Sequence, residues 1–191
     1  MPNWTYNSVT PDDDAARKFI EENCLDDKGH FTFNKMIPCP KVLNMLSSPQ
    51  LYIEDDEDIS KIEKRVPAEY KHLIKEGIYI EFPEIPVGRV TKAKYAELIA
   101  KYGAGCWYDW RLKNWGCKWD ASSNDHDEHS YWFTTPWSIP DSFMQELAKR
   151  LPKGSSIGWC AEYEEGFREE YTLKDGVVHL ERREDIEYEE E

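Results

Sequence analysis

The chain has 191 residues, of which 40% are hydrophobic and 14% aromatic, and its formal net charge at pH 7 is −14. This apolar content is enough to form a buried core, which excludes a fully disordered chain. No segment approaches the roughly 18 apolar residues that a membrane span needs, and the first residues lack the basic and apolar regions of a secretory signal. We therefore expect a folded cytoplasmic protein that does not bind membranes.

The charge and the cysteines indicate the kind of partner and the redox environment. A strongly acidic protein repels nucleic-acid backbones and attracts basic protein surfaces, although acidity can also serve solubility alone. Direct nucleic-acid binding is thus disfavoured but not excluded. The five cysteines are odd in number, scattered and never spaced as C-x-x-C, which favours reduced thiols over a disulfide framework.

The first third of the chain predicts a strand, a helix and a second strand. Alternation over residues 4–9 indicates the first strand, and Thr10 and Pro11 are typical of an N-cap and first helical position. Apolar residues at helical spacing follow, up to about Cys24. Residues 31–37 then predict a second strand, which ends at Pro38.

Residues 41–102 predict an interrupted helical segment, which we interpret as an acidic helical insertion. Its acidic run, Glu54–Asp58, is typical of a solvated face or loop. The clearest helix spans Thr91–Tyr102, with Gly103 placed as its C-terminal cap.

The last part of the chain contains two aromatic segments, residues 107–120 and 131–137, which predict strands separated by the polar residues 121–130. An amphipathic helix should begin at Pro140-Asp141 and end before Pro152. An antiparallel meander follows, with Asp175-Gly176 as a hairpin turn. Together these elements predict an α+β domain over residues 1–183, with helices on one face of an antiparallel sheet, and an acidic tail at 184–191.

Four motifs of this chain are similar to those of a known family. They are Met1-Pro2-Asn3-Trp4 through Asn7, Phe31-Thr32-Phe33-Asn34-Lys35 with Ile37-Pro38, Asn114-Trp115-Gly116 followed by Lys118-Trp119-Asp120, and Phe133-Thr134-Thr135-Pro136-Trp137-Ser138. Cys117 departs from the pattern, in which a small hydroxyl residue is expected. They resemble YubB-like and Api-like proteins of phages and plasmids. The resemblance implies a ferredoxin-like domain, a name that describes strand order and not an iron–sulfur cluster. It also implies a mobile-element origin, and phage and plasmid accessory proteins often counter host defences in the bacterial cytoplasm.

No recognised catalytic or cofactor-binding motif is present, so we expect neither enzymatic activity nor a cofactor. His126 and His129 lie three residues apart among carboxylates, and these side chains are potential metal ligands. A zinc site, however, usually needs three or four convergent ligands at recognisable spacing. The favoured interpretation is a solvated loop, and a metal-dependent enzyme remains the minor alternative.

Residues 107–119 interleave aromatic and basic side chains, a pattern that can stack bases and bind phosphates. Residues 89–118 contain seven basic and two acidic residues. One alternative is therefore a nucleotide or single-stranded nucleic-acid binding module. Its candidate ligand-binding residues are Trp110, Arg111, Trp115, Lys118 and Trp119.

The leading hypothesis is an acidic inhibitor that imitates DNA or otherwise occupies a basic surface. In this hypothesis the partner is a host protein with a basic surface, such as a nucleic-acid-binding defence complex, as for an anti-CRISPR protein. The candidate partner-binding residues are Glu54, Asp55, Asp56, Glu57, Asp58, Glu164 and Glu165.

Overall fold

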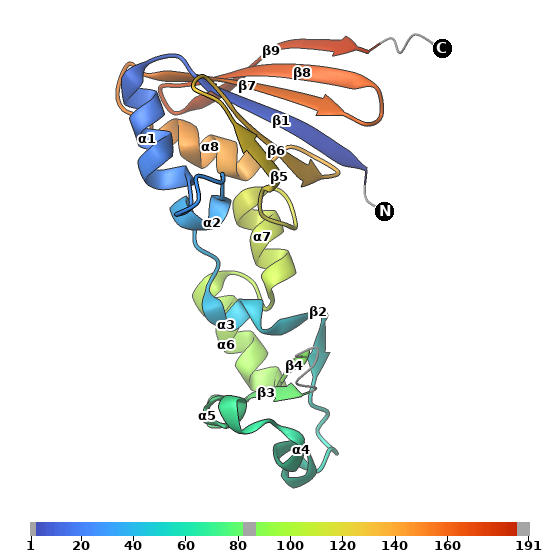
Figure 1. The fold of residues 1–191 in the computed structure, drawn as a ribbon. Coiled ribbons are helices and arrows are strands. Elements are labelled where there is room, and N and C mark those ends of the chain that lie inside the picture. Colours follow the sequence, from blue (N-terminus) through green and yellow to red (C-terminus); the bar gives the residue numbers. More distant parts are fainter. Residues whose placement is uncertain (1–2, 82–86, 187–191) are drawn as a thin grey trace. The chain divides into compact units, whose positions relative to one another are not determined.

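The computed structural model describes residues 3–81 and 87–186, except the side chains of residues 47–50. It confirms the expected α+β mixture of helices and antiparallel sheet. The chain divides into two compact units, one formed by residues 1–38 and 111–191 and the other by residues 39–110 (Figure 1). The segments before and after the intervening unit therefore fold together.

A six-stranded antiparallel sheet forms the discontinuous unit, with the strand order β5-β6-β1-β7-β8-β9. The first strand thus lies in the interior of the sheet, between two strands that come late in the chain. The strands are β1 (Trp4–Pro11), β5 (Ser122–His126), β6 (Tyr131–Pro136), β7 (Ser156–Tyr163), β8 (Phe167–Lys174) and β9 (Val177–Asp185).

Helices α1 (Asp14–Cys24) and α8 (Asp141–Arg150) cover one face of this sheet, and neither lies on the opposite face (Figure 1). The amphipathic pattern that predicted α8 is confirmed, because its apolar stripe is buried. The buried side chains of α8 are Phe143, Met144, Leu147 and Ala148.

Helix α1 begins later than predicted. Its N-cap is Asp13, whose Oδ1 accepts a hydrogen bond from the Ala16 backbone N–H at 2.9 Å. Thr10 and Pro11 still belong to β1, where they pair with β7. The prediction was wrong because Thr10 and Pro11 pair with β7 and so remain in the strand. Asp13, three residues after Thr10, is also a good N-cap and begins the helix instead.

Aromatic rings fill the space between the sheet and the helices. Phe31 stacks on Phe133 with 4.7 Å between ring centroids, and Phe33 lies 4.6 Å from Phe143. These four side chains and Trp159 are each at most 2% exposed. Burying one such side chain stabilises the fold by roughly 1.5–3 kcal/mol, so this cluster holds the segment after α1 against the sheet.

The prediction of a second strand over residues 31–37 is wrong. Phe31 forms only an isolated bridge with Leu25, and a short helix, α2 (Phe33–Met36), follows. Thr32 is its N-cap, with Oγ1 accepting from the Asn34 N–H at 3.2 Å. Phe33 and Met36, three residues apart, are both buried, so packing is better served by a helical turn.

The strand prediction for residues 107–120 is also wrong, since they contain helix α7 (Trp107–Trp115). Buried Cys106 and Trp110 are four residues apart, which is a helical and not a strand spacing. The polar segment 121–130, expected as a loop, contains the edge strand β5. The strand at 131–137 and the C-terminal meander are confirmed.

The final strand is longer than predicted, because β9 runs to Asp185 and so includes the start of the expected acidic tail. Residues 187–191 lie outside the described part of the chain. The turn at Asp175-Gly176 is confirmed, with positive φ angles of 50° and 82° at the two residues.

The intervening unit was expected to be a helical insertion. It also contains a three-stranded sheet, with the strand order β2-β4-β3. Side chains of Ile53, Ile62, Val66 and Tyr79 form a buried cluster in this unit. Its elements are α3 (Lys41–Asn44), β2 (Leu46–Tyr52), α4 (Ile59–Arg65), a 3-10 turn (Ala68–Tyr70), α5 (Lys71–Ile74), β3 (Ile78–Glu81), β4 (Val87–Val90) and α6 (Lys92–Tyr102).

The predicted helix near residues 91–102 is confirmed as α6. Thr91 is its N-cap, and Gly103 caps its C-terminus in the left-handed conformation, with φ 72°. The unit is also less acidic than its central acidic run suggests, since residues 39–110 hold 12 acidic and 10 basic residues. Most of the excess negative charge therefore belongs to the discontinuous unit.

Candidate functional site

The uncovered face of the six-stranded sheet is built by simple strand alternation. In β1 the odd-numbered residues from Thr5 to Pro11 are buried beneath the helices, while the even-numbered residues point away from them. Tyr6 on β1 and Trp132 on β6 consequently project from the uncovered face, with 51% and 38% of their surfaces exposed.

The strand register places small residues between these two aromatic side chains. Ser8 pairs with Trp132 on one side and with Cys160 on the other, and Tyr6 pairs with Thr134 and Glu162. Large side chains thus stand around a floor of small ones, which leaves a hollow of about 270 Å³. We call it the sheet hollow; it is lined by Tyr6, Asn7, Ser8, Ser123, Trp132, Phe133, Thr134, Cys160 and Glu162.

Carboxylates border the sheet hollow on its β7 and β8 side. Arg168 contacts both Glu162, at 3.3 Å, and Glu170, at 2.8 Å. One guanidinium therefore faces two carboxylates, and the local balance is negative. A second hollow of about 270 Å³ shares Ser8 and Cys160 with the first and adds Glu170 and Glu181 to its lining.

Cys160 forms part of the floor of both hollows. Burial raises the pKa of its thiol above the usual range, and Arg168 offsets only part of this effect. The thiol is therefore protonated at neutral pH, and a protonated thiol is a poor nucleophile. Cys160 contributes shape and not reactivity to the sheet hollow.

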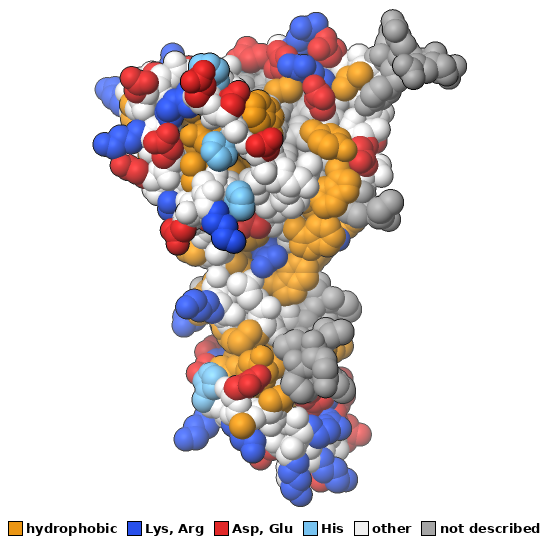
Figure 2. All heavy atoms as spheres, in the orientation of Figure 1, with side chains coloured by type: hydrophobic (Ala, Val, Ile, Leu, Met, Phe, Trp, Pro, Cys, Tyr) orange, Lys and Arg blue, Asp and Glu red, His pale blue; other side chains and the backbone are white. Residues whose placement is uncertain are grey.

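A second aromatic group continues the surface beyond Tyr6. The Lys118 Nζ lies 3.9 Å from the ring centroid of Trp119 and 4.0 Å from that of Trp137, so the cation is held between two indoles. Trp4 of β1 lies 6.1 Å from Trp119. Figure 2 shows hydrophobic side chains gathered in a band over this part of the sheet. We call the whole set the aromatic surface; it comprises Trp4, Tyr6, Trp119, Trp132 and Trp137.

Trp137 has an unusual backbone for a bulky residue, with φ 69°. Its N–H donates to the Asn3 carbonyl at 2.8 Å, and the Thr135 hydroxyl donates to the Ser138 carbonyl at 2.7 Å. These bonds hold the turn in the left-handed region while half of the Trp137 surface stays exposed. Local strain combined with an exposed indole is typical of recognition sites.

The structure separates the residues predicted to bind a nucleotide. Trp110 and Trp115 are only 7% and 1% exposed, so neither presents a ring face to solvent. The Trp115 Nε1 donates to the Ile37 carbonyl at 2.9 Å, and the Arg111 guanidinium lies over the Trp115 ring. Lys118 and Trp119 are the members of the predicted set that reach the aromatic surface.

The predicted acidic run is largely engaged by neighbouring cations. Lys92 contacts Glu54 at 3.7 Å and Asp55 at 3.3 Å, and Arg89 contacts Glu57 at 2.5 Å. That arginine holds the pKa of Glu57 below its usual range. The remaining members are Asp56, which is exposed, and Asp58, which caps α4 and pairs with Lys61 at 3.7 Å.

Glu164 and Glu165, predicted as part of the same partner-binding set, belong to the other unit. The Glu164 side chain accepts from the Trp4 N–H at 2.8 Å and from the Tyr6 hydroxyl at 3.4 Å. Glu165 accepts from the Asn3 side chain at 2.8 Å. Both carboxylates are exposed and adjoin the aromatic surface, to which they add negative charge.

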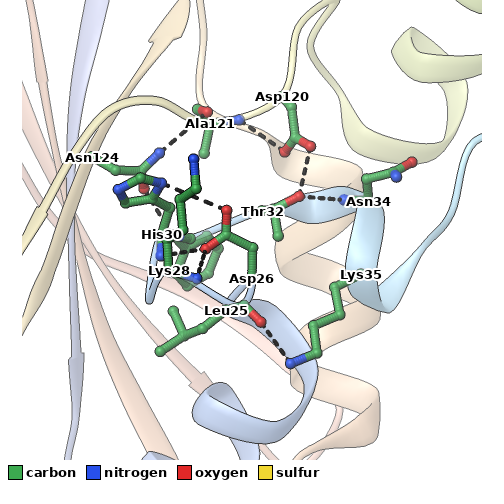
Figure 3. A network of polar contacts seen from close by, with 11 residues as sticks. Leu25, Asp26, Lys28, His30, Thr32, Asn34, Lys35, Asp120, Ala121 and Asn124 are labelled. Carbon is green, nitrogen blue, oxygen red and sulfur yellow. Dashed lines mark hydrogen bonds and ion pairs between the residues drawn. The ribbon is translucent and has the colours of Figure 1, made fainter.

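A separate polar network surrounds Asp120 (Figure 3). Its Oδ2 accepts from the Thr32 hydroxyl at 2.7 Å, and its Oδ1 accepts from the N–H groups of Phe33, at 2.7 Å, and Ala121, at 2.9 Å. Asn124 accepts from the Phe31 N–H at 2.9 Å. Because these oxygens already satisfy backbone donors, the network anchors the loop after α1 and is structural.

The histidines predicted as metal candidates lie at the edge of the sheet. His126 ends β5 with its ring 6.2 Å from that of Tyr131, and His129 contacts Glu128 at 3.3 Å. Within the described residues, no group of three or more His, Cys, Asp or Glu side chains is placed to hold a metal ion. The five cysteines, each within that part of the chain, form no disulfide.

Comparison with known proteins adds no assignment: the chain matches no protein-family model, and no curated protein or solved structure is significantly similar to it. None of the helices in the described ranges has the length and apolar character needed to cross a bilayer.

Sequence reasoning missed Tyr6, Trp132 and Trp137. The sequence of this strand could have predicted an exposed aromatic side chain. Side chains alternate between the two faces of a strand, so the consecutive residues Tyr131, Trp132 and Phe133 place aromatic rings on both faces. Only one face of an antiparallel sheet packed by helices is covered, so a large aromatic on the other face is exposed.

Proposed function

We propose that this protein acts by binding another protein through the uncovered face of its sheet, and that the partner presents a basic surface. The observation that carries this proposal is the exposed aromatic surface around the sheet hollow, bordered by carboxylates. Aromatic side chains dominate the energetics of protein interfaces, and contiguous exposed apolar patches mark interaction sites. The carboxylate border favours a cationic partner and accelerates encounter with it.

A binding role is better supported than catalysis. Glu162 and Glu170 share the Arg168 guanidinium, and the Cys160 thiol, whose pKa is raised by burial, is a poor nucleophile. The extent of the surface suits contact with a macromolecule, since exposed aromatic side chains continue beyond the hollow to Trp119 and Trp137.

The strand order supports a more specific origin for the chain. The order β5-β6-β1-β7, with α1 after β1 and α8 after β6, is the order expected of a ferredoxin-like domain, and β8 and β9 extend it. This agrees with the resemblance to YubB-like and Api-like phage and plasmid proteins. We accordingly propose a mobile-element accessory protein that inhibits a host factor, such as a nucleic-acid-binding defence complex.

A capture experiment with paired variants tests the binding proposal. The tagged protein is incubated with a bacterial lysate, and the double variant Tyr6→Ser/Trp132→Ser is compared with Leu112→Ser/Val177→Ser, which removes two other exposed apolar side chains of the same unit. We expect one stoichiometric basic protein to be retained by the wild type and the control pair and lost by the first pair. Binding of the purified partner should weaken as salt rises.

Retention of the same partner by Tyr6→Ser/Trp132→Ser would overturn the proposed surface. A partner that is acidic, or whose affinity rises with salt, would overturn the proposed chemistry.

A nucleotide or single-stranded nucleic acid is the second candidate ligand, favoured by one observation. Trp119 and Trp137 flank Lys118 at the surface, which provides two stacking faces and one cation. Titration with oligothymidylate should then quench tryptophan fluorescence, and Trp119→Leu should reduce the quench. A flat titration removes this candidate, which the neighbouring Glu164 and Glu165 disfavour electrostatically.

A further inference from the structure

We propose that the sheet hollow is a subsite for one arginine side chain of the partner. This inference rests on the proposed protein-binding function and specifies the group that enters its centre. Its outline follows from the register: aromatic rings of Tyr6 and Trp132 stand on either side of a floor made by Ser8, Thr134 and Cys160.

The size of the hollow suits a single side chain. The hollow has a volume of about 270 Å³, and Tyr6 and Trp132 are among the side chains that line it. A guanidinium is planar and weakly hydrated, and it stacks on aromatic faces more readily than an ammonium does. The apolar part of the arginine side chain would cover the exposed ring surfaces while its charged end reaches the border of the hollow.

The polar lining supplies hydrogen-bond acceptors for that charged end. Glu162 uses Oε1 to contact Arg168, and a carboxylate accepts more than one donor, so Oε2 is available to a second guanidinium. The hydroxyls of Ser8 and Ser123 add neutral acceptors within the same hollow. Arg168, placed between Glu162 and Glu170, already shows that this region accommodates guanidinium–carboxylate contacts.

Charge distinguishes an arginine from a nucleobase, which would stack on the same rings. A base entering the sheet hollow brings phosphates toward Glu162, Glu164 and Glu170, and like charges at short range oppose binding. The described residues that line the hollow include Glu162 and no basic side chain, and nearby Arg168 is already shared by Glu162 and Glu170. The electrostatic balance therefore favours a cation.

The test uses the full-length protein and small probes of matched shape. N-acetyl-arginine amide, its neutral isostere N-acetyl-citrulline amide, and AMP are titrated while the indole N–H resonance of Trp132 is followed by NMR; that resonance is identified by its absence in Trp132→Leu. We expect saturable shifts with arginine and binding of citrulline that is roughly five- to tenfold weaker, because a charge-assisted hydrogen bond becomes a neutral one.

Two variants locate the charge that matters. Glu162→Gln keeps the shape of the side chain and should abolish the preference for arginine over citrulline. Asp27→Asn removes one exposed carboxylate from the loop after α1 and should leave the preference unchanged.

Equal binding of arginine and citrulline, or tighter binding of AMP, would overturn the arginine subsite. If arginine fails at Trp132 while partner capture still requires Tyr6 and Trp132, the subsite is wrong and the binding surface stands. If capture does not require these residues, the proposed function fails regardless of the probe result.

Discussion

Asp120 shows how one side chain can join segments far apart in the chain. Its carboxylate accepts hydrogen bonds from Thr32 and Phe33, which are 88 and 87 residues away in sequence (Figure 3). Without it, partly buried donors lose their acceptors, and the loop after α1 loses its attachment. The segment from Asn114 to Asp120 therefore contributes mainly to structure, through the buried Trp115 and through Asp120, and to the surface through Lys118 and Trp119.

Asp120→Ala should lower the free energy of unfolding by about 2–3 kcal/mol, because charge-assisted hydrogen bonds are lost and donors are left unsatisfied. Urea denaturation followed by circular dichroism measures the change. Asp27→Ala, on the exposed part of the same loop, should change stability by less than about 0.5 kcal/mol. Equal effects of the two substitutions would contradict the anchoring role of Asp120.

Trp137 combines backbone strain with an exposed indole, and two substitutions separate these properties. Trp137→Ala keeps the left-handed backbone at φ 69° and removes the ring, whereas Trp137→Gly removes both the ring and the strain. The glycine variant should be more stable than the alanine variant by about 1 kcal/mol, measured by urea denaturation. Both should weaken partner binding equally; a binding loss confined to one variant would mean that backbone conformation, and not the indole, governs recognition.

At the scale of elements, Gly116 determines how α7 meets the start of α8. Its φ is 86°, and an added Cβ would lie 1.9 Å from Oδ1 of Asp141 and 2.7 Å from its backbone nitrogen. The two helices can approach this closely only because no side chain intervenes.

Gly116→Ala should therefore lower the free energy of unfolding by about 3 kcal/mol or more, from left-handed strain together with a steric clash. Gly154 provides a matched control, since its φ is 87° but nothing lies within 4 Å of an added Cβ. Gly154→Ala should cost only about 1–2 kcal/mol, the strain alone. Thermal or urea unfolding compares the pair, and equal costs would exclude the clash at Asp141.

At the scale of the whole molecule, several exposed carboxylates that cap helices or turns make stability sensitive to acid. The Ala16 N–H lowers the pKa of Asp13, the His30 N–H that of Asp26, and the His129 N–H that of Asp127. Each folded-state pKa is lower than the unfolded value of about 4. Their stabilisation is thus complete above about pH 4 and is lost as the pH falls through the lower folded values.

The urea midpoint should accordingly decrease as the pH drops below about 4. Asp13→Asn, combined with Asp127→Asn, removes two of these titrating groups and should make the decrease shallower. A pH profile with an unchanged slope would show that other carboxylates dominate acid unfolding.

Amino-acid pattern alone determined much of this protein: the α+β class, helices α6 and α8, strand β6 and the C-terminal meander. These elements share strong local signals, such as the Gly103 cap and the Asp175-Gly176 turn, whose conformations depend on few neighbours. Tertiary structure decided the rest. Residues 33–36 and 107–115 are helical because a helical spacing buries Phe33 together with Met36 and Cys106 together with Trp110, which outweighs the local strand propensity.

The candidate site depended even more on tertiary structure. Strand pairing brings β1 between β6 and β7, and only that register places Tyr6, Trp132 and Glu162 around one hollow. Burial, in turn, removes Trp110 and Trp115 from the surface that composition had suggested. Sequence specifies which side chains alternate along a strand, but which face the helices cover, and hence which aromatics remain exposed, is set by packing of the whole unit.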